Sequence, residues 1–158
     1  MNTSTAPTRR SLLSGALVLC GALLLTLGQG CSTLEYTPRA NLVQEHSFEW
    51  VSRRLRKVLG QAVEPPVASV RVKPDSFTYT TFTDSTPIPS IRYLNVERVD
   101  LYAGAWALVY SRQGDMLARF QLLSQNDAYA LADLLASLQS WAASKSATQT
   151  EHNLNSGW

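Results

Sequence analysis

The chain has 158 residues, of which 14 are Lys or Arg, 12 are Asp or Glu, and 45% are hydrophobic. This length suits one domain, because domains commonly hold about 150 residues. Charged residues make up only 16%, and there are four Trp, six Tyr and four Phe, a composition that excludes a disordered polyelectrolyte and a coiled coil.

Residues 1–30 have the three parts of a secretory signal peptide. A polar segment ends in Arg9 and Arg10, an uncharged Leu-rich run covers residues 12–27, and mostly small residues follow. A positive flank, a short apolar stretch and a small-residue exit are typical of exported proteins. An uncleaved transmembrane anchor is the alternative, but a span needs about 20 apolar residues and the run stops at residue 27.

Residues 27–31, LGQGC, resemble the lipobox of bacterial lipoproteins. Gly30 matches the small residue before the cut, whereas Gly28 stands where the family usually has Leu. The resemblance implies cleavage before Cys31, attachment of diacylglycerol to its thiol, and acylation of the new amino group by a fatty acid such as palmitate. Ser32 after the cysteine implies the outer membrane, with the protein facing the periplasm. Residues 8–13, TRRSLL, also resemble the twin-arginine export motif, so that route and ordinary Sec export both stay open.

Cleavage would leave a nearly neutral chain that lacks a cysteine pair. Residues 1–30 hold two basic residues and no acidic one, so 12 of each sign remain. Neutrality and export both argue against a nucleic-acid partner. Cys20 would be removed and Cys31 modified, so no disulfide is expected.

The mature chain begins with a polar tether, residues 31–40, followed by an amphipathic helix over residues 42–59. Asn41 with Gln44 is a candidate capping pair, and Gly60 is the expected stop. The apolar stripe recurs at three- and four-residue spacing and consists of Phe48, Val51, Leu55, Val58, Leu59 and Ala62.

From residue 67 the hydrophobic period changes to two, which indicates strands. About six short strands are expected, over residues 67–73, 77–83, 91–95, 96–102, 105–111 and 116–123. Connections this short favour antiparallel pairing, because a parallel crossover needs a dozen or more residues.

A second helix is expected after the strands. It is capped near residues 124–127 and ends near residue 144, and its apolar stripe consists of Leu131, Leu134, Leu135, Leu138, Trp141 and Ala142. Residues 145–158 are polar and aperiodic, which predicts a disordered tail. The predicted organisation is a single α+β domain over residues 41–144, in which two helices cover a strongly bent antiparallel sheet.

Residues 67–142 resemble a pleckstrin-homology-like domain of the bacterial type. The resemblance rests on IRYLNVERVDL at residues 91–101, two hairpin strands, and ARFQL at residues 118–122 leading into the last helix. It implies a bent sheet plugged by that helix, and a scaffold for interaction rather than catalysis. A cystatin-like helix-on-sheet fold is the alternative.

No motif for catalysis, a cofactor or a metal is found. The two histidines, His46 and His152, lie far apart in the sequence, and there is no HExxH, GxSxG or glycine-rich phosphate loop. Metal binding and nucleophilic catalysis need converging ligands or a positioned base. We therefore expect no metal, no cofactor and no enzymatic activity.

Two groups of residues remain as candidates for binding. Arg53, Arg54, Arg56 and Lys57 form a basic cluster, which is either a solvated helix face or a contact for anionic lipid or lipid A phosphates. The second group, expected to be sheet core or an exposed groove for a partner protein, consists of Phe77, Tyr79, Phe82, Tyr93, Tyr102, Trp106 and Tyr110. The leading hypothesis is a lipid-anchored envelope protein acting as a binding or assembly module, with a membrane and an envelope protein as partners. The alternative is a periplasmic carrier of lipid or small molecules.

Overall fold

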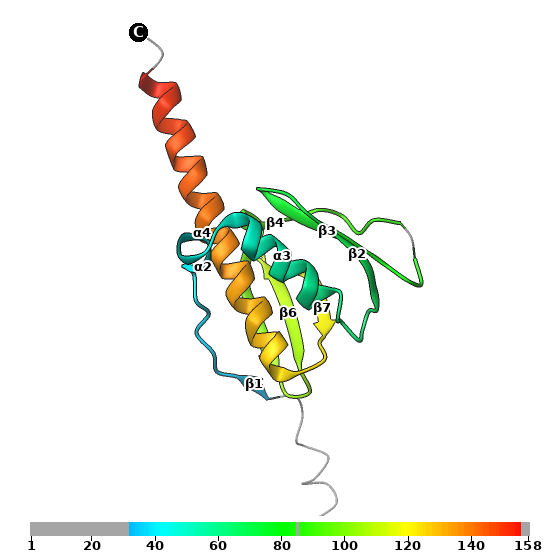
Figure 1. The fold of residues 1–158 in the computed structure, drawn as a ribbon. Helices are drawn as coiled ribbons and strands as arrows, with labels where there is room; N and C mark the ends of the chain where they lie inside the picture. Colours follow the sequence, from blue (N-terminus) through cyan, green and yellow to red (C-terminus); the bar gives the residue numbers. More distant parts are fainter. Residues whose placement is uncertain (1–31, 85, 156–158) are drawn as a thin grey trace, which may run out of the picture. The chain divides into compact units, whose positions relative to one another are not determined.

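The computed structural model describes residues 32–84 and 86–155, with side chains up to Gln149 (Figure 1). The described residues from Thr33 onward form one compact unit. The predicted signal peptide, residues 1–30, and the predicted lipidation site Cys31 lie outside the described residues.

Seven strands of the described chain form two antiparallel sheets. One sheet has the order β1 (Thr33–Leu34), β5 (Val96–Tyr102), β6 (Trp106–Ser111) and β7 (Met116–Gln121). The other has the order β2 (Val67–Val72), β3 (Ser76–Thr81) and β4 (Ile91–Arg92). The predicted α+β class is confirmed. The expected single sheet of about six strands is replaced by two sheets, and the additional strand is β1, which lies in the predicted tether.

Two connections join the sheets. The 3-10 helix η1 (Tyr93–Asn95) leads from β4 into β5. On the other side, Glu64 forms an isolated bridge with Gln121 of β7 just before the chain enters β2. Pro65 and Pro66 separate this bridge from β2 because proline has no N–H to donate to a ladder. The chain therefore passes from one sheet to the other at two places, through η1 and through residues 64–66. The two sheets do not close into a barrel.

The predicted helix over residues 42–59 is two helices, α2 (Leu42–Glu45) and α3 (Phe48–Leu59). The break lies at Ser47, whose hydroxyl accepts the backbone N–H of Trp50 at 3.1 Å and so caps α3. The predicted capping role of Asn41 is wrong, because its side chain donates to Glu45 instead. The predicted apolar stripe of α3 is confirmed: Val51, Leu55 and Leu59 are fully buried.

The last helix, α4 (Gln125–Asn155), is longer than predicted. The expected end near residue 144 and the disordered tail are wrong for residues 145–155, which are helical. The physical reason is that this segment contains neither Gly nor Pro, so the backbone continues the helix even though the apolar stripe has ended. In Figure 1 this part of α4 extends beyond the sheets.

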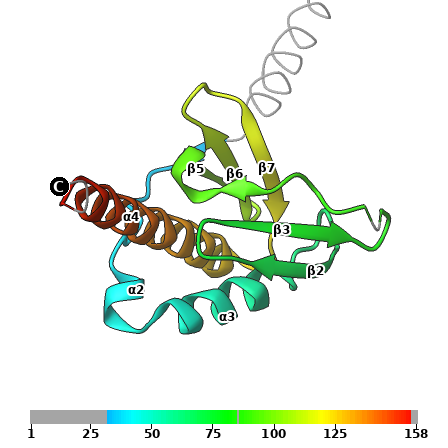
Figure 2. The ribbon, with the colours of Figure 1, turned by 90° about the horizontal axis from the view of Figure 1, so that it is seen from above.

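Helix α4 is the centre of the domain. It packs against α2 and α3 on one side and against β5 and β6 on the other (Figures 1 and 2). Residues on all its faces are buried between positions 128 and 142, not only those on the predicted leucine stripe. Asp133 and Ser137, which interrupt the apolar pattern, are only 6% and 1% exposed.

The N-terminal segment, residues 33–39, is bound to the domain. β1 pairs with β5 through Thr33 opposite Tyr102. The Tyr36 ring stacks on Tyr129 of α4 with centroids 4.6 Å apart, and the Tyr36 hydroxyl donates to Asp133 at 2.7 Å. The backbone N–H of Arg39 donates to the same carboxylate at 2.8 Å. The prediction of a free tether is therefore wrong over these residues, because a buried carboxylate needs these donors.

Tyr93 fastens η1 to the turn between β2 and β3. Its hydroxyl group donates to two backbone carbonyl oxygens, that of Ser76 at 2.9 Å and that of Lys73 at 3.1 Å. Burial raises the pKa of Tyr93 strongly, and the nearby Asp75 carboxylate adds to this while Arg56 opposes it. Folding therefore favours the protonated phenol.

Replacing Asp133 should loosen the N-terminal segment. Tyr36 and Arg39 both donate to Oδ1 of Asp133, and Oδ2 faces the Arg39 guanidinium. Asp133→Asn leaves a neutral amide oxygen to accept both bonds and puts an NH₂ group against the guanidinium, so we expect a loss of about 2–3 kcal/mol in the free energy of unfolding. Urea denaturation measures this loss, and hydrogen exchange should become faster at the Arg39 amide. Asp115→Asn, in an exposed turn, is the matched control and should change stability by less than ~0.5 kcal/mol. Equal effects of the two variants would contradict the role of Asp133.

Tyr93 should make stability depend on alkaline pH. Its pKa is raised in the folded state, so its contribution is complete below the ordinary tyrosine value of about 10 and is lost as pH rises above it. Tyr93→Phe removes the hydroxyl, so this variant should be less stable at pH 8 but lose less stability between pH 8 and 11. Urea midpoints across that range measure the difference. Parallel losses in the two proteins would contradict this assignment.

Candidate functional site

Three of the four residues of the predicted basic cluster meet at one groove on α3. Arg53, Arg54 and Lys57 line a groove of about 360 Å³ together with Trp50. They lie three, four and seven positions after Trp50, a spacing that places side chains on one helix face. Trp50 is 41% exposed, which is unusual for so large an apolar side chain. We call this surface the α3 groove.

The cations of the α3 groove differ in their partners. The Arg53 guanidinium pairs with Glu49 at 3.0 Å. Among the described residues, no ion pair involves Arg54 or Lys57. The His46 ring stacks on Trp50 with centroids 4.1 Å apart and holds that indole in place. The groove therefore combines two uncompensated positive charges with an exposed aromatic face.

Arg56, the fourth predicted residue, does not line this groove. It is exposed and lies close enough to Tyr93 to lower the pKa of that phenol against the larger effect of burial. The predicted cluster is thus divided between the α3 groove and the side of α3 that faces the β2–β3 turn.

The predicted aromatic set does not form one groove. Phe77, Tyr79 and Tyr93 are buried, whereas Phe82 is 77% exposed. Phe77 and Tyr79 belong to β3, whereas Phe82 follows directly after its last residue, Thr81. The remaining three, Tyr102, Trp106 and Tyr110, are half-buried in β5 and β6, and guanidinium groups lie over two of them: Arg98 over Tyr110 at 4.5 Å and Arg119 over Trp106 at 5.4 Å.

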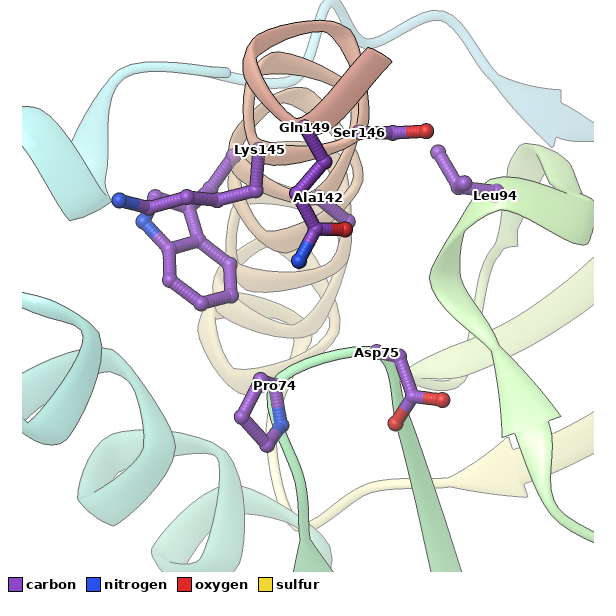
Figure 3. A pocket seen from close by; sticks show the side chains of 8 residues that line it. Pro74, Asp75, Leu94, Ala142, Lys145, Ser146 and Gln149 are labelled. Atoms are coloured by element: carbon purple, nitrogen blue, oxygen red, sulfur yellow. The ribbon is translucent and has the colours of Figure 1, made fainter. Parts of the chain in front are cut away.

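A second groove, of about 440 Å³, lies where α4 leaves the sheets. Figure 3 shows Gln149 and Lys145 of α4 on one side and Pro74 and Asp75 of the β2–β3 turn on the other. Its lining is Pro74, Asp75, Leu94, Trp141, Ala142, Lys145, Ser146 and Gln149. The Lys145 ammonium lies 6.0 Å from the centre of the Trp141 ring, and that ring stacks on Phe48 of α3.

Sequence reasoning missed this second groove. Lys145 and Gln149 fall in the stretch predicted to be disordered, and Pro74 and Asp75 were expected only to form a turn. The one available signal was the absence of Gly and Pro from residues 145–155, which favours a longer helix.

The described residues contain no group of three or more His, Cys, Asp or Glu side chains that could hold a metal ion. Across the described part of the chain, no helix combines the length and the apolar character that crossing a bilayer requires. Comparisons of the chain with protein-family models, with curated proteins and with solved structures gave no match.

Proposed function

We propose that the chain is a lipid-anchored protein of the cell envelope whose domain is a non-catalytic binding or assembly module. The localisation part of this proposal rests on residues 1–31, where a basic flank, a short apolar run and LGQGC follow one another. Attachment through Cys31 would place the domain in the periplasm, and Ser32 favours the outer membrane. Two or three acyl chains hold a protein on a bilayer, since each buried CH₂ contributes about 0.8 kcal/mol.

The observation that carries the binding role is the α3 groove. Arg54 and Lys57 present positive charge without an acidic partner among the described residues, next to an exposed Trp50. Cations beside an aromatic ring fit an acidic segment of a protein partner, which can pair with the charges and pack an apolar side chain on the indole. An acidic segment of an envelope protein is therefore the proposed ligand, and anionic lipid is the competing outcome of the test.

We also propose that the domain is pleckstrin-homology-like. Short antiparallel strands in two sheets, followed by a helix that packs on them, are consistent with a pleckstrin-homology-like domain. In such a domain the grooves serve for interaction, which agrees with the proposed role, although fold alone does not determine function. In the carrier alternative a ligand would need an apolar cavity between helix and sheet, where Leu131, Leu135 and Leu138 are at most 1% exposed. These leucines fill the space that a carried ligand would occupy, and the α3 groove is open to a partner. Both observations favour the binding module over the carrier.

Lipidation can be tested directly on the protein made in a bacterial host. We expect intact-mass spectrometry of the membrane fraction to show loss of residues 1–30 together with the mass of a diacylglycerol and one further acyl chain at Cys31. Cys31→Ser should accumulate as uncleaved precursor, because the thiol is the attachment point. A cleaved product with a free Cys31 thiol would contradict the proposal.

The binding role can be tested by charge reversal with a matched control. The probe is a fluorescent deca-glutamate peptide, added to the full lipidated protein in nanodiscs of neutral phosphatidylcholine. We expect Arg54→Glu with Lys57→Glu to weaken binding about tenfold, equivalent to ~1.4 kcal/mol, with the affinity falling as salt rises. Arg71→Glu with Lys73→Glu makes the same change in net charge on exposed residues of the β2 region and should have little effect.

The same variants distinguish the two ligand classes. If the α3 groove instead binds lipid, the nanodisc-bound protein should capture phosphatidylglycerol vesicles but not the peptide, and the α3 variant should lose this capture. Equal binding by both variants, for peptide and for vesicles alike, would overturn the role of the α3 groove.

A further inference from the structure

At one end of the four-stranded sheet, one residue from each strand lies in a single row of paired residues. In successive ladders Thr33 of β1 lies opposite Tyr102 of β5, Tyr102 opposite Trp106 of β6, and Trp106 opposite Gln121 of β7. The isolated bridge then places Glu64 opposite Gln121. Four steps of about 4.8 Å between neighbouring strands make this row about 19 Å wide. We call it the Tyr102 end of the sheet.

The segments just beyond this row contain no charged residue. The antiparallel ladders place residues 103–105, residues 122–123 and residues 62–63 there, with the sequences AGA, LL and AV. Leu123 is 67% exposed and Val63 is 52% exposed. Backbone bonds hold the segments together: the N–H of Leu122 donates to Ala105 and that of Val63 to Gln121.

Aromatic side chains and a compensated ion pair line the same end. Tyr102 and Trp106 are half-buried in the row itself. The Arg119 guanidinium lies over the Trp106 ring and pairs with Glu64 at 3.0 Å. An uncharged rim of small and aliphatic residues, bordered by Tyr and Trp, suits the interface between lipid headgroups and acyl chains.

The chain leaves the domain at this end. Thr33 is the first residue of β1 and belongs to the row, and residues 33–39 are held on α4 by Asp133. Cys31 precedes Thr33 by two residues in the sequence, and two residues of extended chain span at most about 7 Å. A lipid on Cys31 would therefore hold the Tyr102 end against the bilayer.

Helix α4 runs from this end to the opposite one. Near its start, the Gln125 side chain accepts the backbone N–H of Ala105. Fourteen positions later, Gln139 donates to the carbonyl of Val96 at 2.7 Å, and Val96 begins β5 at the far end from Tyr102. The helical rise over this interval is ~21 Å, which matches the ~20 Å length of β5. The axis of α4 therefore lies nearly along β5, and the two elements run in opposite chain directions.

We propose that the Tyr102 end, through residues 103–105, Val63 and Leu123, is a membrane-contacting surface that seats the domain upright on the lipid bilayer holding Cys31. The C-terminal half of α4 then points away from that bilayer, with the second groove well above it. This inference rests on the lipid attachment proposed for Cys31 and adds to it the face of the domain that touches lipid.

Single-cysteine labelling of the full lipidated protein tests the orientation, because cleavage removes Cys20 and lipid occupies Cys31. Leu123→Cys and Val63→Cys place an environment-sensitive fluorophore at the Tyr102 end, at side chains that are already more than half exposed. Ala147→Cys, exposed on α4, is the matched control at the far end. The bilayer is phosphatidylcholine with a nitroxide on a fraction of its headgroups, which quenches nearby fluorophores.

We expect at least threefold stronger quenching at positions 123 and 63 than at position 147. Equal quenching at the three positions, stronger quenching at 147, or no quenching at any of them in membrane-bound protein would overturn the orientation and leave lipidation intact. Labelling of Cys31 itself in the parent protein would show a free thiol, and in that case the lipid attachment fails first.

Discussion

The buried carboxylate of Asp133 is the interaction on which the rest of the structure depends. It accepts hydrogen bonds from the Tyr36 hydroxyl and the Arg39 backbone and lies 3.5 Å from the Arg39 guanidinium. Burying a carboxylate costs free energy unless such partners compensate it. The N-terminal segment supplies them, so α4 can be covered on the side that the sheets leave open. Ser137 acts in the same way one turn later, where its hydroxyl accepts the Val43 backbone N–H at 2.9 Å.

This arrangement fixes the point at which the chain leaves the domain. A free tether of ten residues would let the domain rotate in any direction above a membrane. A segment bound to α4 and paired with β5 instead sets the exit at Thr33, beside the uncharged rim of the Tyr102 end. The proposed membrane contact, the α3 groove and the second groove then occupy separate parts of the domain. Lipid anchoring and partner binding could therefore take place at the same time without competing for one surface.

Patterns of apolar residues predicted much of this fold from the sequence. The α3 stripe, the alternation in β6 and β7 and the leucine stripe of α4 all reflect burial of one face, which periodicity detects. The errors come from polar contacts between distant segments. Asp133 and Ser137 have the residue types of a solvent-facing side, and only their partners in residues 36–43 explain their burial. The break at Ser47 depends on a cap inside an otherwise helical pattern, and the length of α4 depends on helix propensity without an apolar stripe. Among the candidate site residues, the helical spacing of Arg53, Arg54 and Lys57 predicts their common face, but nothing in the sequence places Arg56 beside Tyr93.

Neutron reflectometry of the lipidated protein on a supported phosphatidylcholine bilayer tests the central claim most directly, because it measures how far the protein extends from the membrane. Helix α4 has 31 residues and so is about 46 Å long, and in the upright orientation it stands nearly along the membrane normal. We therefore expect a protein layer at least about 45 Å thick. A layer of about 30 Å, the thickness of two helices and one sheet lying flat, would contradict it.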